Sequence, residues 1–335
     1  MTVRVGVNGF GRIGRNFFRA AAAQGADVEF VAVNDLGSLD QMAHLLKYDS
    51  VMGRLGADVR AVKGGIRVGD HTIRVLSERN PADLPWGDLG VDVVVESTGI
   101  FTDRAKAAMH LEGGAPLVIV SAPSNGADLT VVYGVNHRDF RRRDHKVISN
   151  ASCTTNCLAP VASVLQDAIG IKRGFMTTVH SYTGDQPTLD TMHKDLYRAR
   201  AAAMSMIPTS TGAAKAVGLV LPELNGKLDG VAIRVPTPNV SAVDLTFETD
   251  RGTTIEEINA AIHAAAEGPL KGVLGVTDAK LVSMDFNHDS HSSIFATDQT
   301  KVMDGNMCRI LTWYDNEWGF SCRMADTAVA MAALM

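Results

Sequence analysis

A chain of 335 residues, 46% of them hydrophobic and 21% charged, has the composition of an ordinary globular protein. At about 100 to 200 residues per domain, this length predicts two domains, each able to bury a core. The formal charge of -5 argues against nucleic acid as a main partner. No apolar run approaches the ~18 residues of a membrane span, and no secretory signal is apparent, so we expect a cytoplasmic protein without a membrane partner.

The first segment reads as strand, glycine turn and helix. Residues 3–7 are a short apolar run, and residues 12–24 form an Ala-rich helical pattern that stops at Gly25. Between them, Gly9, Gly11 and Gly14 match G-x-G-x-x-G, whose glycines allow a tight turn and a close approach of the backbone to a pyrophosphate. The free N–H groups of the helix would face the phosphates. The pattern predicts a dinucleotide site.

A second apolar strand, "VEFVAVND", ends at Asp35, 21 residues after Gly14. An acidic residue at this position accepts hydrogen bonds from an adenosine ribose. The same carboxylate would repel a 2'-phosphate, so we expect NAD rather than NADP as the cofactor.

Strands and helices continue to alternate up to residue 124. Residues 91–99 and 116–124 read as strands, with a helical pattern at 102–114 between them. This order predicts a mostly parallel sheet with ligands at the carboxyl ends of its strands. Thr98, Gly99 and Ser121 stand at such ends, although small residues are also ordinary turn formers there.

The stretch "SNASCTTNCLAP" places Cys153 at the start of a helix predicted over residues 156–169. Unpaired N–H groups and the helix dipole favour a thiolate at that position, so we expect a lowered thiol pKa and a nucleophile. Cys157, four residues later, is interpreted as a packed thiol. C-x-x-x-C alone does not provide a metal site, and we expect neither a metal nor a disulfide.

Two further patterns add a base and an anion site. A strand ends at His180, where it can bring an imidazole to the thiol. Hydroxyl and glycine residues at 209–212 precede a helix, and Lys194, Arg198 and Arg200 follow one another closely. Arg234 interrupts an apolar strand and requires a partner, which the sequence leaves open as an anionic substrate or a carboxylate.

In this order, "NGFGRIGR", "ASCTTNC", "HSYTGDQ", "PTSTGAAKAVGLVLPEL", "RVPTPNVSAVDL" and "WYDNEWGFS" resemble the phosphorylating glyceraldehyde-3-phosphate dehydrogenases, from Val3 to the C-terminus. The resemblance implies an α/β protein with a Rossmann NAD-binding domain at residues 1–151, completed by a helix at 317–335. It implies an α+β catalytic domain with a mixed or antiparallel sheet at 152–316, and a homotetramer.

The same resemblance assigns site residues, with Cys153 as nucleophile and His180 as base. For the cofactor, it and the glycine pattern together indicate Gly9, Gly11, Arg12, Ile13, Gly14, Asp35, Arg79, Ser121 and Asn316. For the substrate phosphate and inorganic phosphate, it indicates Ser152, Thr154, Thr183, Arg198, Thr211, Gly212 and Arg234.

The implied reaction oxidises glyceraldehyde 3-phosphate with NAD and inorganic phosphate to 1,3-bisphosphoglycerate, through a thiohemiacetal and a thioester on Cys153. The nearest alternative is the same chemistry on another phosphorylated aldehyde, such as erythrose 4-phosphate. A cysteine acyl-hydrolase would leave the glycine turn and Asp35 unexplained. A binding protein without activity would be expected to have lost the thiol or the base, and both are present.

Four residues depart from the family pattern. Thr191-Met192 replaces a frequent Leu-Pro, Tyr197 a frequent arginine and Gly184 a frequent asparagine. They suggest an isozyme with altered cofactor preference or altered sensitivity to thiol-directed inhibitors.

Overall fold

The computed structural model describes residues 2–335, which form two compact units. Unit 1 contains the described residues up to Val131, residues 137–151 and the segment from Ser321 onward. Unit 2 contains residues 132–136 and 152–320. None of the helices in residues 2–335 has the length and apolar character required to span a bilayer.

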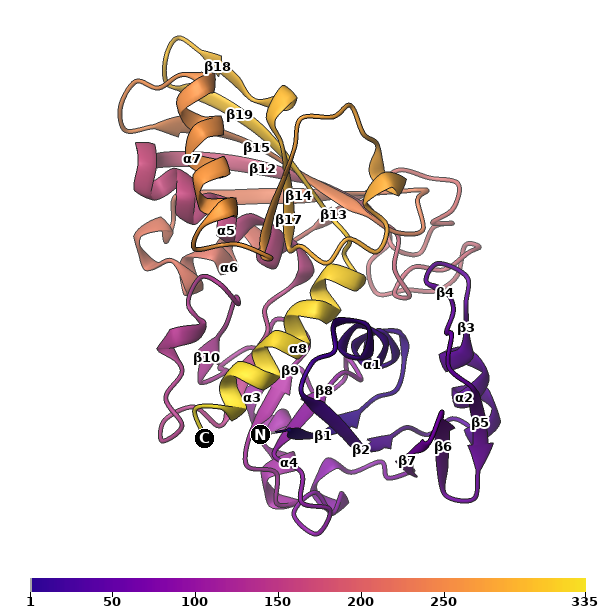
Figure 1. The fold of residues 1–335 in the computed structure, drawn as a ribbon. Helices are drawn as coiled ribbons and strands as arrows, with labels where there is room; N and C mark the ends of the chain where they lie inside the picture. The colour runs from indigo at the N-terminus through magenta and orange to yellow at the C-terminus, as the bar shows by residue number, and fades with distance from the viewer. Residues whose placement is uncertain (1) are drawn as a thin grey trace. The chain divides into compact units, whose positions relative to one another are not determined.

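Unit 1 is built on a nine-stranded sheet in the order β10-β11-β9-β8-β1-β2-β7-β6-β5 (Figure 1). The strands from β10 to β7 are parallel to their neighbours, and β6 and β5 continue the sheet antiparallel. The strands are β1 Val3–Asn8, β2 Val28–Asn34, β5 Val59–Val62, β6 Gly65–Val68, β7 His71–Leu76, β8 Val93–Glu96, β9 Val118–Val120, β10 Leu129–Thr130 and β11 Val147–Ser149. A separate hairpin pairs β3 Tyr48–Asp49 with β4 Gly53–Arg54.

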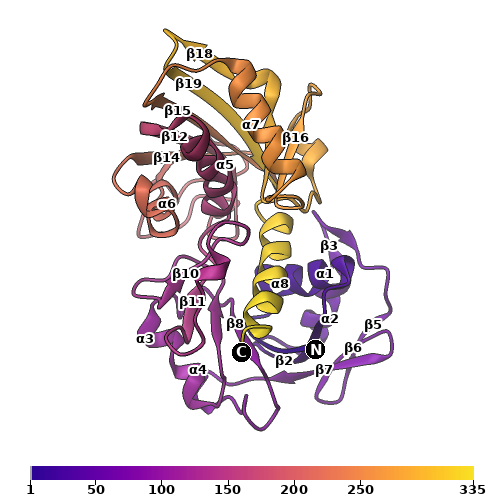
Figure 2. The same ribbon diagram turned by 60° about the vertical axis from the view of Figure 1, so that its left-hand side comes forward.

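The helices of unit 1 include one that returns from the far end of the chain. They are α1 Arg12–Gln24, α2 Leu39–Lys47, α3 Arg104–Ala107, α4 Met109–Glu112 and most of α8 Trp318–Ala332. In both views α8 lies beside α1 (Figures 1 and 2). The Thr327 hydroxyl in α8 donates to Asn150 Oδ1 at 2.8 Å, and both side chains are fully buried.

The helical pattern at 102–114 corresponds to two short helices, because the regular helix is interrupted at Ala108 between α3 and α4. His110, in α4, is fully buried and contacts Trp86 and Glu96. A local pattern of apolar residues does not predict this break, since both partners of His110 come from other segments of the chain.

The core of unit 1 includes Trp86, whose indole is fully buried against the middle of β1. Gly6 lies in this strand, and a Cβ atom on it would stand 2.5 Å from Trp86 Cζ3. The ring therefore occupies the space that a side chain at position 6 would need.

Unit 2 contains a mixed sheet of eight strands. Seven of them run in the order β13-β14-β12-β15-β19-β17-β16, and β18 pairs with β19. The β12–β14 and β16–β17 pairs are parallel, and the others are antiparallel. The strands are β12 Ile171–Ser181, β13 Ile207–Ser210, β14 Leu228–Val235, β15 Ser241–Thr249, β16 Leu274–Thr277, β17 Ser293–Ala296, β18 Lys301–Met303 and β19 Met307–Tyr314.

Three helices pack on unit 2's sheet: α5 Cys153–Ile169, α6 Ala213–Val220 and α7 Ile255–Glu267. Single 3-10 turns lie at Pro81–Asp83, His137–Asp139, Pro222–Leu224, Ser283–Phe286 and Thr297–Gln299. Along β12, the buried Thr178 and His180 alternate with the exposed Phe175 and Val179. Since α5 contacts β12, the buried side chains face the helix and the exposed ones form an open face of the sheet.

We predict that Gly6→Ala destabilises the protein by about 1–3 kcal/mol, the usual cost of overpacking a core. The new methyl group would overlap the Trp86 ring, which is enclosed and cannot move away. Gly56→Ala is the control, because its Cβ would meet nothing within 4 Å, and its free energy of unfolding should change by less than about 0.5 kcal/mol. Urea unfolding of both variants measures the difference. Equal stabilities for the two variants would contradict the packing argument.

Candidate active site

Cys153 is the first residue of α5, one residue after the N-cap. The Ser152 hydroxyl caps the helix by accepting from the N–H of Thr155 at 3.0 Å. Ala151, just before the cap, has a φ of 56°, a left-handed conformation that is uncommon for alanine. This sharp turn and the cap together determine where the sulfur at the start of the helix lies.

The imidazole of His180 faces this sulfur from the end of β12. Cys153 Sγ and His180 Nε2 are 3.5 Å apart, and His180 is almost fully buried. The other ring nitrogen, Nδ1, lies 2.7 Å from the carbonyl oxygen of Ser181. The tautomer with the proton on Nδ1 leaves Nε2 free to accept a proton from the thiol. The Ser181 carbonyl favours this tautomer, whereas Arg234 Nη1, a donor 2.8 Å from Nδ1, opposes it.

Arg234 lies beside His180 because the two residues are register partners in the parallel β12–β14 pair. Its Nη1 donates to the carbonyl oxygen of Ser181 at 3.1 Å and lies 2.8 Å from His180 Nδ1. No carboxylate lies within ion-pair distance of Arg234 in residues 2–335, and its buried Nε has no hydrogen-bond partner there. The sequence left open whether the partner of Arg234 is a carboxylate or an anionic substrate. Since no carboxylate lies at the guanidinium among these residues, the anionic substrate is the partner that remains.

The electrostatics of the pair correct one expectation. Burial raises the pKa of the Cys153 thiol, and the positive charge of Arg234 acts in the opposite direction. The predicted net lowering at the helix N-terminus is therefore wrong, because the cost of removing a thiolate from water at this half-buried position is the larger effect. Burial, with the charge of Arg234 added to it, lowers the pKa of His180 to about 3. The imidazole is thus neutral near pH 7 and able to act as a base.

Two helix N-termini lie close together next to the thiol. The Thr155 hydroxyl in α5 donates to the carbonyl oxygen of Ala213, the first residue of α6, at 3.2 Å. Gly212 is the N-cap of α6 and provides no side-chain cap, while the Thr211 hydroxyl accepts from Ala213 N at 3.2 Å. Converging helix N-termini favour anions.

The remaining candidate phosphate residues differ in their surroundings. The Arg198 guanidinium pairs with Asp185, and its charge adds to the effects that lower the pKa of His180. Thr183 lies in a turn closed by a hydrogen bond from Gln186 N to its carbonyl oxygen at 2.9 Å. The Thr154 side chain is buried, and its hydroxyl points toward the buried Tyr314 hydroxyl at 2.8 Å.

Unit 1 contains a pocket of about 340 Å³ at the carboxyl ends of β1, β2 and β8. Of the predicted cofactor residues, Gly9, Gly11, Asp35 and Arg79 line it. The other lining residues are Asn8, Asn34, Leu36, Glu78, Ser97, Thr98, Ile100 and Phe101. The pocket lies where a parallel sheet binds its ligands.

The glycine turn fits a dinucleotide. Gly9 has a φ of 90°, and a Cβ atom on it would stand 2.6 Å from Thr98 N. Gly11, the N-cap of α1, has nothing within 4 Å of its Cβ position and no side-chain cap, so the first N–H groups of α1 are accessible to a pyrophosphate. Asp35 accepts from Phe10 N at 2.8 Å and from Gly37 N at 3.0 Å, which holds its carboxylate at the pocket.

Five predicted cofactor residues do not line this pocket. They are Arg12, Ile13, Gly14, Ser121 and Asn316. Arg12 forms an ion pair with Asp49 at 2.9 Å. Gly14 packs against the turn, since its Cβ would lie 2.3 Å from Gly9 O. Asn316 lies in unit 2, where its Oδ1 accepts from the Ser181 and Ser241 hydroxyls at 2.9 Å each.

Three polar residues at strand ends were not predicted from the sequence: Asn8 in β1, Asn34 in β2 and Glu96 in β8. All three are at least 96% buried. The signal was present, because each is a polar last residue that directly follows an apolar residue of its strand.

The positions that depart from the family pattern lie in the loop between β12 and β13. Met192 is fully exposed and Tyr197 is 61% exposed, and Gly184 has open space around its Cβ position. The loop also exposes Leu189, Leu196, Met204 and Met206.

Comparison with known proteins gives matches in both halves of the chain. Residues 3–104 match the family model of the glyceraldehyde 3-phosphate dehydrogenase NAD binding domain, and residues 152–316 match that of the C-terminal domain. The chain is 68% identical over 336 residues to glyceraldehyde-3-phosphate dehydrogenase of Cereibacter sphaeroides, and 66% over 335 residues to that of Xanthobacter flavus, covering 100% of each chain. Glyceraldehyde-3-phosphate dehydrogenase 2 of Streptomyces arenae is 59% identical over 333 residues, with 99% of each chain covered.

The match to the NAD-binding model agrees with the glycine turn and Asp35, and the match to the C-terminal model covers Cys153, His180 and Arg234. The resemblance seen in the motifs is confirmed, as is the combination of a Rossmann domain with a catalytic domain. The chain belongs to the glyceraldehyde-3-phosphate dehydrogenase family.

Proposed function

We propose that this chain oxidises glyceraldehyde 3-phosphate with NAD and inorganic phosphate, and releases an acyl phosphate. The observation that carries the proposal is the contact of Cys153 Sγ with His180 Nε2 at 3.5 Å, beside Arg234, whose buried Nε has no hydrogen-bond partner within residues 2–335. A thiol and a base alone would also suit hydrolysis. The NAD-binding family match of residues 3–104 favours oxidation, and the names of the relatives favour this aldehyde as substrate.

The side chains of unit 2 perform the covalent steps. Cys153 Sγ passes its proton to His180 Nε2 and forms a bond to the aldehyde carbon, and the protonated imidazole returns this proton to the former carbonyl oxygen, which gives a thiohemiacetal. His180 then takes the proton of the new hydroxyl group, and the C–H bond breaks as a thioester forms. Bound NAD supplies the acceptor for the hydride. Inorganic phosphate attacks the thioester carbon, the C–S bond breaks, and the sulfur leaves as a thiolate.

Two phosphate groups require two anion sites. Arg234 is adjacent to the reacting pair, and Arg198 contributes a second positive charge with Thr183 nearby in the chain. The N-termini of α5 and α6 offer Ser152, Thr211, Gly212 and the backbone N–H of Thr154 as neighbours of the second anion. The backbone N–H of Cys153 is a candidate donor to the oxyanion, an effect typically worth about 3 kcal/mol.

In unit 1, the glycine turn and α1 would hold the pyrophosphate and Asp35 the adenosine ribose. Arg12, Ile13, Arg79 and Ser121 remain proposed cofactor neighbours from the family pattern, and Asn316 is the proposed partner of the nicotinamide amide. Its Oδ1 already accepts hydrogen bonds from two hydroxyl groups, so the Nδ2 amide group is the part of the side chain that remains available to a ligand.

We also propose a homotetramer that works in the cytoplasm. Phe175, Val179 and Val231 expose 51%, 40% and 40% of their surfaces on the open face of the sheet in unit 2, and the loop after β12 adds further exposed apolar side chains. Contacts with other copies would cover such surfaces. The four cysteines are free thiols in the structure, and a reducing compartment would keep them so.

The native chain should form NADH from glyceraldehyde 3-phosphate only when inorganic phosphate is present. Cys153→Ser should lower kcat by about 10³-fold or more, the size of loss seen when an enzyme's nucleophile is removed, because a hydroxyl is a far weaker nucleophile than a thiol. Cys157→Ser is the matched control and should leave kcat nearly unchanged, since this thiol is buried and donates a hydrogen bond to Ser293 Oγ at 3.6 Å. Absorbance at the NADH band measures both. Oxidation without phosphate, or faster turnover of erythrose 4-phosphate, would contradict the proposal.

Arg234→Leu should move the pH profile of Cys153 alkylation by iodoacetamide to higher pH, because the charge of Arg234 opposes the rise of the thiol pKa. Each unit of upward shift slows alkylation about tenfold below the midpoint. Arg200→Leu is the control: this arginine is exposed and pairs with Asp190 at 2.8 Å. A neutral reagent avoids direct attraction to the arginine. An unchanged midpoint in Arg234→Leu would show that the guanidinium does not act on the thiol.

Phe175→Asp should shift the chain from a tetramer to smaller species, since a carboxylate on the open face of the sheet cannot be buried in a contact between copies without a partner. Sedimentation velocity at several concentrations measures the change. Leu334→Asp, at an exposed position in unit 1, serves as the control. A native chain that sediments as a monomer would refute the tetramer.

A further inference from the structure

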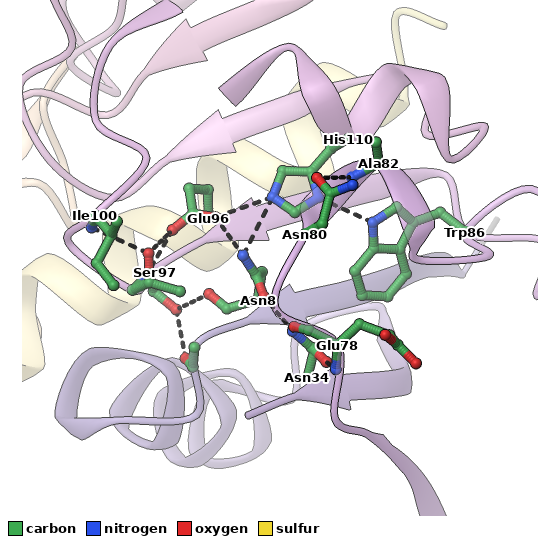
Figure 3. A network of polar contacts seen from close by, with 12 residues as sticks. Asn8, Asn34, Glu78, Asn80, Ala82, Trp86, Glu96, Ser97, Ile100 and His110 are labelled. Carbon is green, nitrogen blue, oxygen red and sulfur yellow. Dashed lines mark hydrogen bonds and ion pairs between the residues drawn. The ribbon is translucent and has the colours of Figure 1, made fainter. Parts of the chain in front are cut away.

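A buried polar network lies behind the cofactor pocket of unit 1 (Figure 3). Its centre is the carboxylate of Glu96, at the end of β8, which is 2% exposed. Glu96 Oε2 accepts from Asn8 Nδ2 at 2.6 Å and lies 2.9 Å from His110 Nε2. Glu96 Oε1 accepts from the N–H and the hydroxyl of Thr98 at 2.8 and 2.5 Å. One carboxylate therefore receives hydrogen bonds from three different segments of the chain.

The tautomer of His110 follows from Trp86. The indole Nε1 lies 3.0 Å from His110 Nδ1 and can only donate, so Nδ1 is the acceptor. The ring proton is therefore on Nε2, where it donates to Glu96. Trp86 is itself held against Gly6, so the orientation of the imidazole is determined by packing as well as by hydrogen bonds.

From Glu96, the network reaches two walls of the pocket. On one side, Asn8 Oδ1 accepts from Asn34 Nδ2 at 2.7 Å, and the Asn34 amide bonds both to Glu78 O at 2.9 Å and to Glu78 N at 2.8 Å. Glu78 precedes Arg79, and both line the pocket. This branch therefore connects the buried carboxylate with the loop that carries Arg79.

On the other side, the Thr98 hydroxyl accepts from Ile100 N at 3.1 Å, and the Ser97 hydroxyl donates to Gly9 O at 2.7 Å. The Gly9 turn and the Ser97–Thr98 peptide are in close contact, since a Cβ on Gly9 would lie 2.7 Å from Ser97 C. The position of Thr98 therefore determines the space available to the glycine turn.

Glu96 and His110 do not themselves line the pocket, whereas Asn8, Asn34, Glu78 and Thr98 do. We propose that the Glu96–His110 pair, with Trp86 behind it, is a positioning device for NAD: it holds the Thr98 loop and the Asn8–Asn34–Glu78 chain at the spacing that the dinucleotide requires. A binding site depends on such supporting contacts to hold its walls in place. The inference rests on the cofactor pocket assigned above.

The test is direct titration of the full-length chain with NAD by calorimetry, combined with thermal unfolding. His110→Leu removes both contacts of the imidazole, and we expect Kd for NAD to rise about tenfold, equivalent to about 1.4 kcal/mol. At saturating NAD and substrate, kcat should stay within about twofold. His110→Gln retains one donor and one acceptor, and should bring Kd back to within about threefold of the native value.

Thr327→Val is the matched control. It removes a fully buried hydrogen bond of the same unit, to Asn150, that is not part of the network around the pocket. It should lower Tm while leaving Kd for NAD within about twofold. Should His110→Leu fail to fold, Glu96→Gln decides the question. The glutamine has only one oxygen, so it cannot accept hydrogen bonds both from Thr98 and from the Asn8 and His110 side chains, and we expect the Kd for NAD to rise by a similar factor.

Three outcomes would overturn the inference: an unchanged Kd in both His110→Leu and Glu96→Gln, an unchanged Kd in Glu96→Gln when His110→Leu cannot be purified, or a Kd raised equally by Thr327→Val at a similar loss of Tm. Each of these outcomes compares the Kd of a variant for NAD with that of the native chain. If the native chain itself did not bind NAD, the proposed function would fail, which is a distinguishable result.

Discussion

The parallel pairing of β12 with β14 is the constraint on which the candidate active site depends. Register places His180 opposite Arg234, and the alternation of a strand turns both side chains toward the face that α5 covers. A shift of one residue would turn His180 to the open face and separate it from Cys153. The base and the guanidinium therefore lie together because of a backbone ladder, and α5, which packs on the same face, brings the thiol to them.

This placement has an electrostatic consequence. The half-buried thiol of Cys153 and the buried imidazole of His180 both resist charging. Arg234 supports the anionic form of the thiol and opposes the cationic form of the imidazole. At rest the pair is best described as a neutral thiol beside a neutral imidazole. The proton then moves to His180 as the sulfur forms its bond to carbon, so a permanently charged pair is not required.

Local patterns predicted much of the fold. The bounds of α1 agree with the predicted residues 12–24, and Cys153 is the first residue of its helix, because capping and periodicity are local properties of the sequence. The raised pKa of Cys153 was not predictable, since it depends on burial by distant segments. The break at Ala108 and the partners of His110 were missed for the same reason. The roles of the individual site residues remain predictions.

Trp86 also limits how the sequence of unit 1 can vary. Its ring takes the space of a side chain at position 6, and its N–H determines which nitrogen of His110 faces Glu96. A smaller residue at 86 would make room at 6 but leave the imidazole without its donor. Positions 6, 86, 96 and 110 are therefore coupled, because a substitution at one position is tolerated only with changes at the others. In a set of related sequences, the four should vary together.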